Sequence, residues 1–430
     1  MMKPSLLPIL VLSCVGLACA EYPVDLPRSQ PWEFEEEEGD DIYLCRTPEA
    51  TDFLFVIDNA GRSCPFQKYL RHNLSEMVDG LLDTGTDLQF GVLTGHAEET
   101  GVIDAEPVAR RGHLQDRAQP LPGFSMECYH EQPAHGDFRR LQEQLQIAVE
   151  CAAEPAQWEH LLDLNRQDLR CLLPQHTINS EGCNPGQATT VEQLLPSPEQ
   201  MRVIGPVIAI EDYEGPGGLD RSALLDDLRC LTAVGSRGFG IQKPIEAVEI
   251  ALSPAFSSAE HAPNYGFIRP LASTAITFFS VKGDCSHDGT LDERTSCGDL
   301  PCYAGDGDGA PGPPLIDVDE LMPRFAANLA QLRGVDLDEV IHQTRVVSFH
   351  GATHRRPVPD DCSAGYQSPV ACHSSAGPVF SGDQLARFAQ WFPRGYGPED
   401  EEALLCGDPS LELTRLATLL GFCTAGIEDG

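Results

Sequence analysis

Short apolar runs alternate with stretches of helical periodicity along most of this chain. The clearest run covers residues 53–57 and leads directly into Asp58 and Asn59. Five consecutive apolar residues are typical of a strand that is buried on both faces of a parallel sheet. The residues after such a strand lie at the carboxyl edge of the sheet, where open α/β folds bind ligands. The pattern therefore predicts a ligand-binding edge at Asp58 and Asn59.

The same periodicities predict further helices and strands in alternation. In chain order they are a helix over 66–81, a strand over 88–94, helices over 138–151, 224–231 and 241–252, a strand over 275–281, a helix over 321–332 and a strand over 345–349. Residues 203–210 offer one further strand. Strands separated by helices indicate an α/β fold with a doubly wound, mostly parallel, Rossmann-like sheet.

Composition divides the chain around this domain, which we place at residues 51–352. Residues 1–20 contain a lysine near the start, then an apolar run and then small residues, which is typical of an export signal peptide. Residues 21–50 are rich in Asp and Glu and predict an acidic linker. The pattern weakens over about 96–200, where cysteines and prolines indicate a disulfide-rich insertion. Residues 353–430 predict a cysteine-containing helical extension that packs on the domain.

Cysteine counting bears on where the export signal ends. Two of the 16 cysteines lie in the signal, and 14 remain beyond Ala20. Cleavage after Ala20, or lipidation of Cys19, leaves all 14 able to pair. Lipidation of Cys14 instead keeps Cys19 in the mature chain, so that one cysteine has no partner. We favour the first two alternatives and leave both open. Either one predicts an exported protein in the periplasm, anchored at the outer membrane or outside the cell, where disulfides persist.

The expected disulfides include several local pairs, each of which stabilises a fold by roughly 2–4 kcal/mol. The pairs suggested by spacing are Cys285 with Cys297 or Cys302, Cys362 with Cys372, and Cys406 with Cys423. The sequence leaves the complete connectivity open. Paired cysteines also remove thiol nucleophiles from the list of candidate catalytic groups.

The formal net charge of −37 narrows the class of partner. A field of this sign repels nucleic acid and anionic membrane surfaces. The remaining partners are proteins and surface polymers. We expect membrane contact only through an N-terminal lipid anchor.

Five motifs, in their order and spacing, resemble exported bacterial proteins with a von Willebrand factor A-type (VWA) domain. The motifs lie at residues 52–59, 90–92, 235–247, 264–269 and 284–286. The resemblance covers roughly residues 51–352. It implies a Rossmann-like domain that binds other proteins, often through a Mg²⁺ or Mn²⁺ ion shared with a carboxylate of the partner.

The resemblance also implies a metal-ion-dependent adhesion site, and here that site is degenerate. Asp58 keeps the first ligand position, but Ala60 and Arg62 replace the two serines of the family motif. Val281 stands where the later aspartate is expected, and Asp284 follows three residues on. The residues that we assign to the region of this site are Asp58, Asn59, Arg62, Ser63, His96, Ser236 and Asp284.

We expect this site to hold no metal and the protein to need no cofactor. One hypothesis places the Arg62 guanidinium where the cation would lie, paired with Asp58 or Asp284, because a buried carboxylate needs a partner. The alternative is that Arg62 points into solvent. Mg²⁺ binding and weak Ca²⁺ affinity in the acidic loop at 284–308 stay open.

Catalytic motifs are incomplete along the whole chain. The segment from His130 to His135 resembles a zincin motif, but its spacing is wrong and Pro133 breaks the required helix. We therefore expect a non-enzymatic, exported protein-interaction or adhesion domain of the cell envelope. The alternatives are a metal-dependent hydrolase that uses His96, His350 and His354, and a structural envelope protein stapled by disulfides.

Overall fold

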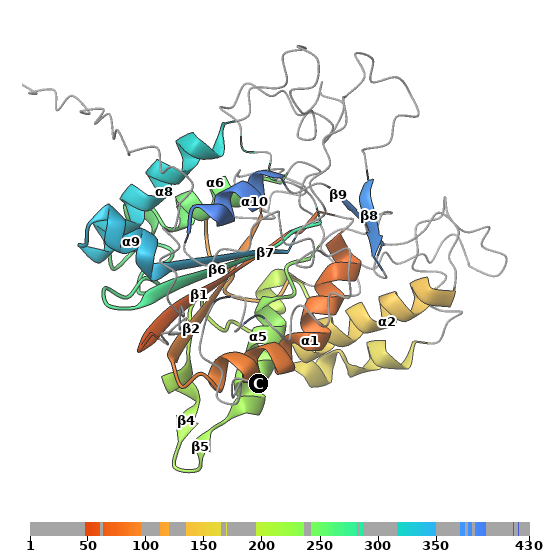
Figure 1. The fold of residues 1–430 in the computed structure, drawn as a ribbon. Coiled ribbons are helices and arrows are strands. Elements are labelled where there is room, and N and C mark those ends of the chain that lie inside the picture. The colour runs from red at the N-terminus through yellow and green to blue at the C-terminus, as the bar shows by residue number, and fades with distance from the viewer. Residues whose placement is uncertain are drawn as a thin grey trace, which may run out of the picture. The chain divides into compact units, whose positions relative to one another are not determined.

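The computed structural model of the chain centres on a five-stranded sheet with the strand order β3-β2-β1-β6-β7 (Figure 1). The strands are β1 (Ala50–Ile57), β2 (Asp87–Thr94), β3 (Ile208–Ala209), β6 (Ser273–Phe279) and β7 (Thr344–Phe349). All neighbouring pairs are parallel except β2 with β3. The expected mostly parallel sheet is thus confirmed. The strand offered by 203–210 is only two residues long and forms an antiparallel edge.

The structure describes a large part of the chain, with gaps. The described residues are 48–60, 63–95, 112–119, 135–164, 169, 195–235, 242–281, 284, 286, 316–349, 370–374, 377–380, 383–392, 416 and 420. The expected signal peptide, nearly all of the acidic linker and most of the insertion lie outside them. The suggested local disulfides also fall outside what the structure describes.

Helices cover both faces of the sheet, and β1 supplies alternate side chains to each face. Phe53, Phe55 and Ile57 pack against the helices of one face, and Leu54 and Val56 against those of the other. The first face carries α1 (Cys64–Leu82) and α5 (Arg221–Leu231), and the second carries α6 (Pro244–Ala251), α8 (Val318–Arg333), α9 (Leu337–Gln343) and α10 (Asp383–Gln390). Successive strand residues point to opposite faces, so a continuous apolar run suits this double cover. The expected doubly wound arrangement is confirmed.

The remaining elements are short or lie at the periphery of the sheet. They are α2 (His135–Glu150), α7 (Pro254–Ser257), the hairpins β4 (Glu214–Gly215) with β5 (Gly218–Leu219) and β8 (Val370–Ser374) with β9 (Gly377–Phe380), and the 3₁₀ turns η3 (Pro155–Gln157), η4 (Glu159–Asp163), η5 (Pro198–Gln200) and η6 (Ile210–Tyr213). The helix expected at 241–252 begins at Pro244, because proline suits the first position of a helix. No helix in the described ranges combines the length and apolar character needed to cross a bilayer.

A disulfide between Cys151 and Cys230 joins the end of α2 to the last turn of α5. The two Cα atoms lie 5.7 Å apart, and the bond closes a sequence separation of 79 residues. Both sulfurs belong to a small apolar cluster with Ile147, Met201 and Ala233. The bridge therefore fixes part of the predicted insertion to the main sheet domain. Spacing alone did not suggest this pair.

Candidate functional site

The topology of the sheet changes direction at β1. The chain passes from β1 to β2 on one side and later reaches β6 on the other. The residues after β1 lie between these neighbours, because the Asp58 N–H donates to the Phe279 carbonyl and the Gly95 N–H donates to the Ile57 carbonyl, each at 3.0 Å. Crevices at such switch points are the usual ligand sites of open α/β sheets. Asp58 and Asn59 therefore lie at the expected edge, as the sequence predicted.

A compact turn follows β1 and uses the side chains of two predicted site residues. One oxygen of Asp58, Oδ1, accepts the Ala60 N–H at 2.7 Å. The Ser63 hydroxyl donates to the Ala60 carbonyl at 2.7 Å, and Ser63 is buried. Short polar side chains commonly close turns in this way. The Ser63 hydroxyl thus helps to shape the loop after β1.

Gln67 of α1 ties this turn to the end of the α5 segment. Its Nε2 donates to the Asp58 carbonyl at 2.9 Å, to the Ser63 hydroxyl at 2.9 Å and to the Gly235 carbonyl at 2.7 Å. Its side chain is buried. Sequence analysis missed Gln67. The available signal was a polar residue next to Phe66, on the buried side of an otherwise amphipathic helix.

Asn59 is the most unusual residue at this edge. The residue is 1% exposed. Neither the Nδ2 nor the Oδ1 of its carboxamide has a hydrogen-bond partner within the described structure. An unmade hydrogen bond of a buried polar group costs about 1–3 kcal/mol, so such groups need an explanation. A ligand that brings a donor and an acceptor to this edge supplies one.

Lys243 brings a buried positive charge to the same edge. It precedes α6, its N–H donates to the Gly95 carbonyl at 2.7 Å, and its side chain is almost fully buried. Its Nζ lies 4.0 Å from the Glu246 carboxylate. Sequence analysis missed this residue too. Two features of the sequence could have drawn attention to it: Lys243 is one of only four lysines, and it stands in an apolar stretch.

Asp284 and Ser286 cap the start of α6. Asp284 Oδ1 accepts the Ile245 N–H at 2.9 Å, and its Oδ2 accepts the Ser286 N–H at 3.0 Å. The Ser286 hydroxyl accepts the Glu246 N–H at 3.3 Å. Burial raises the pKa of Asp284 to about 6, although these hydrogen bonds and the charge of Lys243 oppose the rise. Carboxylates are favourable at helix N-termini, where backbone N–H groups lack partners.

The structure thus brings four of the seven predicted site residues to one edge of the sheet. Asp58, Asn59 and Ser63 share the turn after β1, and Asp284 contacts α6, whose leading residue Lys243 bonds Gly95 after β2. The three other predicted residues, Arg62, His96 and Ser236, lie outside the described residues. The pairing of Arg62 with an aspartate therefore stays a prediction.

The described groups at this edge do not suit a divalent cation. Mg²⁺ needs several free oxygen ligands in near-octahedral geometry. Asp284 already receives hydrogen bonds on both oxygens, and the nearby ammonium of Lys243 repels a cation. In the ranges that the structure covers, no three His, Cys, Asp or Glu side chains are grouped to hold a metal ion. We derive no chemistry through a metal at this site.

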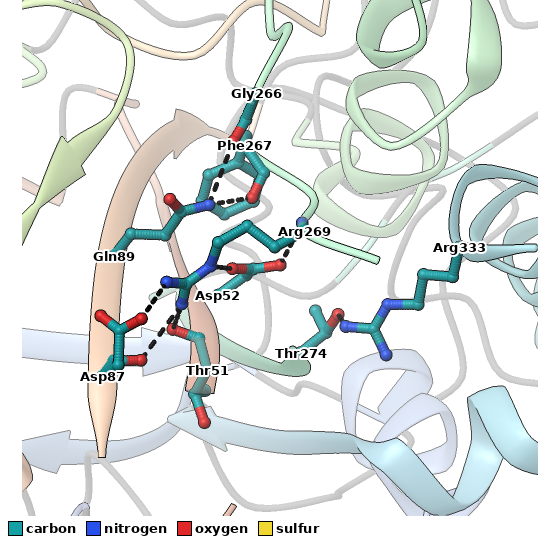
Figure 2. Close-up of polar contacts among 9 residues, drawn as sticks. All are labelled: Thr51, Asp52, Asp87, Gln89, Gly266, Phe267, Arg269, Thr274 and Arg333. Atoms are coloured by element: carbon teal, nitrogen blue, oxygen red, sulfur yellow. Dashed lines mark hydrogen bonds and ion pairs between the residues drawn. The ribbon is translucent and has the colours of Figure 1, made fainter. Parts of the chain in front are cut away.

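The opposite, amino edge of the sheet carries a dense ionic network (Figure 2). Arg269 donates through its backbone N–H and its Nε to the two oxygens of buried Asp52, at 2.8 and 2.7 Å. Its other nitrogens donate to the Asp87 carboxylate and carbonyl and to the Thr51 carbonyl. Every one of these acceptors belongs to the start of β1 or β2. The network therefore holds the two strands in register and marks this edge as structural.

Acid pH is expected to stabilise the fold through Asp284. Its folded pKa of about 6 lies above the ordinary value of 3.8, so the folded state binds the proton more tightly. The contribution is fully present below about pH 4 and is lost as the pH rises through 6, by roughly 3 kcal/mol. Urea unfolding at several pH values between 4 and 7 measures it. Asp284→Asn should flatten this part of the profile, and an unchanged slope in that variant would contradict the assignment.

Comparison with known proteins leaves the family of this chain open. No family model and no curated protein sequence matches it.

Proposed function

We propose that this chain is an exported, non-catalytic interaction protein of the VWA type, with a disulfide-rich insertion. In this proposal it binds a protein or a surface polymer at the carboxyl edge of its sheet. The parallel sheet and the position of Asp58 after the central strand support the resemblance. The oxidising compartment implied by the cysteine count agrees with the Cys151–Cys230 disulfide.

The observation that carries the proposal is the buried carboxamide of Asn59. It offers a donor and an acceptor at the switch point of the sheet, and neither is used within the described structure. A carboxamide pairs best with a group that also presents one donor and one acceptor. The peptide unit of a polypeptide backbone is such a group. The site therefore favours a protein over a surface polymer as the partner.

Charge balance at the edge supports binding without a bridging ion. Lys243 supplies a buried positive charge close to the carboxylates of Glu246 and Asp284. A buried carboxylate is stable when a cation or several hydrogen bonds accompany it. In the proposal, Lys243 does for these carboxylates what a metal ion does in intact adhesion sites. Recognition then depends on hydrogen bonds at Asn59 and on the shape of the edge.

The test begins with capture of a partner from the exported fraction of producing cells by chemical cross-linking and mass spectrometry. The identified partner is then purified and titrated by calorimetry against the oxidised wild-type protein and the Asn59→Leu variant. We expect Asn59→Leu to weaken binding at least about tenfold, because each lost hydrogen bond to a ligand costs of the order of 1 kcal/mol or more. The same titration with and without a chelator should give equal affinities.

The variant separates a binding role from a structural one. Leucine has the same number of side-chain heavy atoms as asparagine, although it is bulkier, and it removes two buried polar groups without partners, so Asn59→Leu should keep most of the stability. Leu271→Ser is the matched control, because Leu271 is 96% exposed and precedes β6 at the opposite edge. Equal effects of the two substitutions would place the interface elsewhere. A search that finds no saturable partner would overturn the proposed function.

A further inference from the structure

A pocket of about 310 Å³ lies between α1, α2 and the end of α5, on the flank of the molecule where Figure 1 shows these helices side by side. This volume is at the lower end of the range for small-molecule sites. Its polar and charged lining residues are Gln67, Lys68, Arg71, His72, Glu143, Gln144, Gln146, Glu150 and Arg229. Ile147, Ala233 and Gly235 complete the wall. Most of the lining side chains are therefore polar or charged, but apolar atoms, including the carbon stems of these side chains, supply the larger part of the pocket surface.

Arg71 is the arginine of this wall that is partly buried and whose two terminal guanidinium nitrogens have no partner among the described residues. Its Nε donates to the Arg229 carbonyl at 3.1 Å. Within the described part of the chain, its two terminal nitrogens make no hydrogen bond and no ion pair. Burial lowers the pKa of Arg71 to about 10, so the charge is kept at neutral pH at an energetic cost. A contacting anion would offset that cost.

The other charged groups of the pocket already have partners. Lys68 forms an ion pair with Glu143 at 2.7 Å. The Gln146 amide donates to Glu150 at 2.6 Å, and Arg229 contacts Asp226 at 3.2 Å. Glu143 and Glu150 raise the pKa of Arg71 only through longer-range attraction. The pocket thus presents one available positive charge within a protein of net charge −37.

The two acidic residues also limit the charge of a suitable ligand. Lys68, Arg71 and Arg229 carry three positive charges, and Glu143, Glu150 and Asp226, the partner of Arg229, carry three negative ones. The charges around the pocket thus sum to zero, so a monoanion that pairs with the Arg71 guanidinium meets less repulsion from Glu143 and Glu150 than a dianion such as phosphate does. A carboxylate also matches the planar fork of a guanidinium. Ile147 and Ala233, both buried, offer apolar contact to a short hydrocarbon group.

We propose that this pocket binds a small monocarboxylate, whose carboxylate pairs with Arg71 and whose short apolar body rests on Ile147 and Ala233. The site is separate from the protein-binding edge and does not rest on the function proposed there. The two are nonetheless joined through Gln67, which lines the pocket and holds the turn at Asp58. The Cys151–Cys230 disulfide holds α2 in place as one wall.

The test uses the full, oxidised protein and three probes: propionate, benzoate and inorganic phosphate. Calorimetric titration should show saturable binding of a carboxylate to the wild type, in the millimolar range or tighter. Arg71→Gln should weaken it at least about tenfold, since it removes the positive charge whose terminal nitrogens have no partner among the described residues. Arg221→Gln is the matched control, because Arg221 lies on α5 outside the pocket and pairs with exposed Asp79. It should leave the affinity unchanged.

A second measurement needs no variant and so does not depend on the folding of Arg71→Gln. Phenylglyoxal modifies accessible arginines, and mass spectrometry follows each site. Benzoate should slow modification of Arg71 several-fold and leave that of Arg221 unchanged. The proposal is overturned by three results: no carboxylate binding at about 10 mM, equal binding by Arg71→Gln, or phosphate binding as tight as benzoate. An unprotected Arg71 in the presence of bound benzoate would also overturn it.

Discussion

Replacing Arg269 with methionine should lower the free energy of unfolding by about 3–5 kcal/mol at pH 7. The variant leaves the buried carboxylate of Asp52 without its hydrogen-bonded cation, with only the longer-range attraction of Arg333, and it frees Asp87 and the Thr51 carbonyl at the same edge. Removing one partner of a buried ion pair is costly because the other charge is then desolvated and uncompensated. Urea unfolding followed by circular dichroism measures the change.

The pH dependence of this loss identifies its cause. Burial raises the pKa of Asp52 to about 6 even though Arg269 opposes the rise. Without Arg269 the folded pKa rises further, so the penalty belongs to the ionised form. The destabilisation of Arg269→Met should therefore be much smaller at pH 4.5 than at pH 7, and Asp52→Asn in the same chain should recover part of it.

An exposed arginine provides the comparison for this experiment. Arg324 pairs with Glu249 at 2.6 Å, and its side chain is half exposed. Arg324→Met should cost no more than about 1 kcal/mol, as surface ion pairs do. Equal losses in the two variants, or a loss in Arg269→Met that does not change with pH, would show that the network of Figure 2 does not anchor the strands.

Removing the Cys151–Cys230 disulfide, by changing both residues to alanine, should cost about 4 kcal/mol. The bond closes a sequence separation of 79 residues, and a loop of this length restricts the unfolded chain strongly. The two sulfurs are also buried in an apolar cluster, so the smaller alanine side chains lose packing there. Equilibrium unfolding under oxidising conditions measures the loss.

The location of this damage can be checked separately from its size. Hydrogen exchange should speed up in α2 and at the end of α5, whereas β1 and β6 at the centre of the sheet should keep their protection until global unfolding. Uniformly faster exchange would show that the bridge supports the whole domain. A loss below about 1 kcal/mol would contradict the account based on chain entropy.

The two edges of the sheet differ in how completely their buried polar groups are satisfied. At the amino edge, Arg269 connects the starts of β1 and β2 with short hydrogen bonds. At the carboxyl edge, Asn59 is buried with its polar groups unused in the described structure, which costs stability. Proteins accept such costs where a ligand later satisfies the groups. This contrast agrees with the binding role that we propose for the carboxyl edge.

Local patterns in the sequence were sufficient for the framework. The apolar run at 53–57 predicted a doubly covered central strand, and the structure buries Phe53 to Ile57 fully. Helical spacing placed α1, α5 and α8 within a few residues of their ends. These features depend on periods of two and about 3.6 residues, which neighbouring positions along the chain determine.

The interactions that the sequence failed to identify join residues far apart along the chain. Gln67 binds Gly235, 168 positions away, and Arg269 binds Asp52, 217 positions away. Lys243 and Asp284 meet at the start of α6 although α6, α7 and β6 lie between them along the chain. Such pairings leave no periodic trace in the sequence, because either partner alone resembles an ordinary polar residue.

The sequence by itself determined the class of fold, the central strand and the edge at which Asp58 and Asn59 lie, because burial patterns and the rule for parallel strands are local or topological. Only the tertiary structure revealed which charges occupy that edge, which two cysteines join α2 to α5, and which pocket Arg71 lines. The physical reason is that charge balance, desolvation and cavity shape depend on groups brought together by folding, which their order along the chain does not reveal.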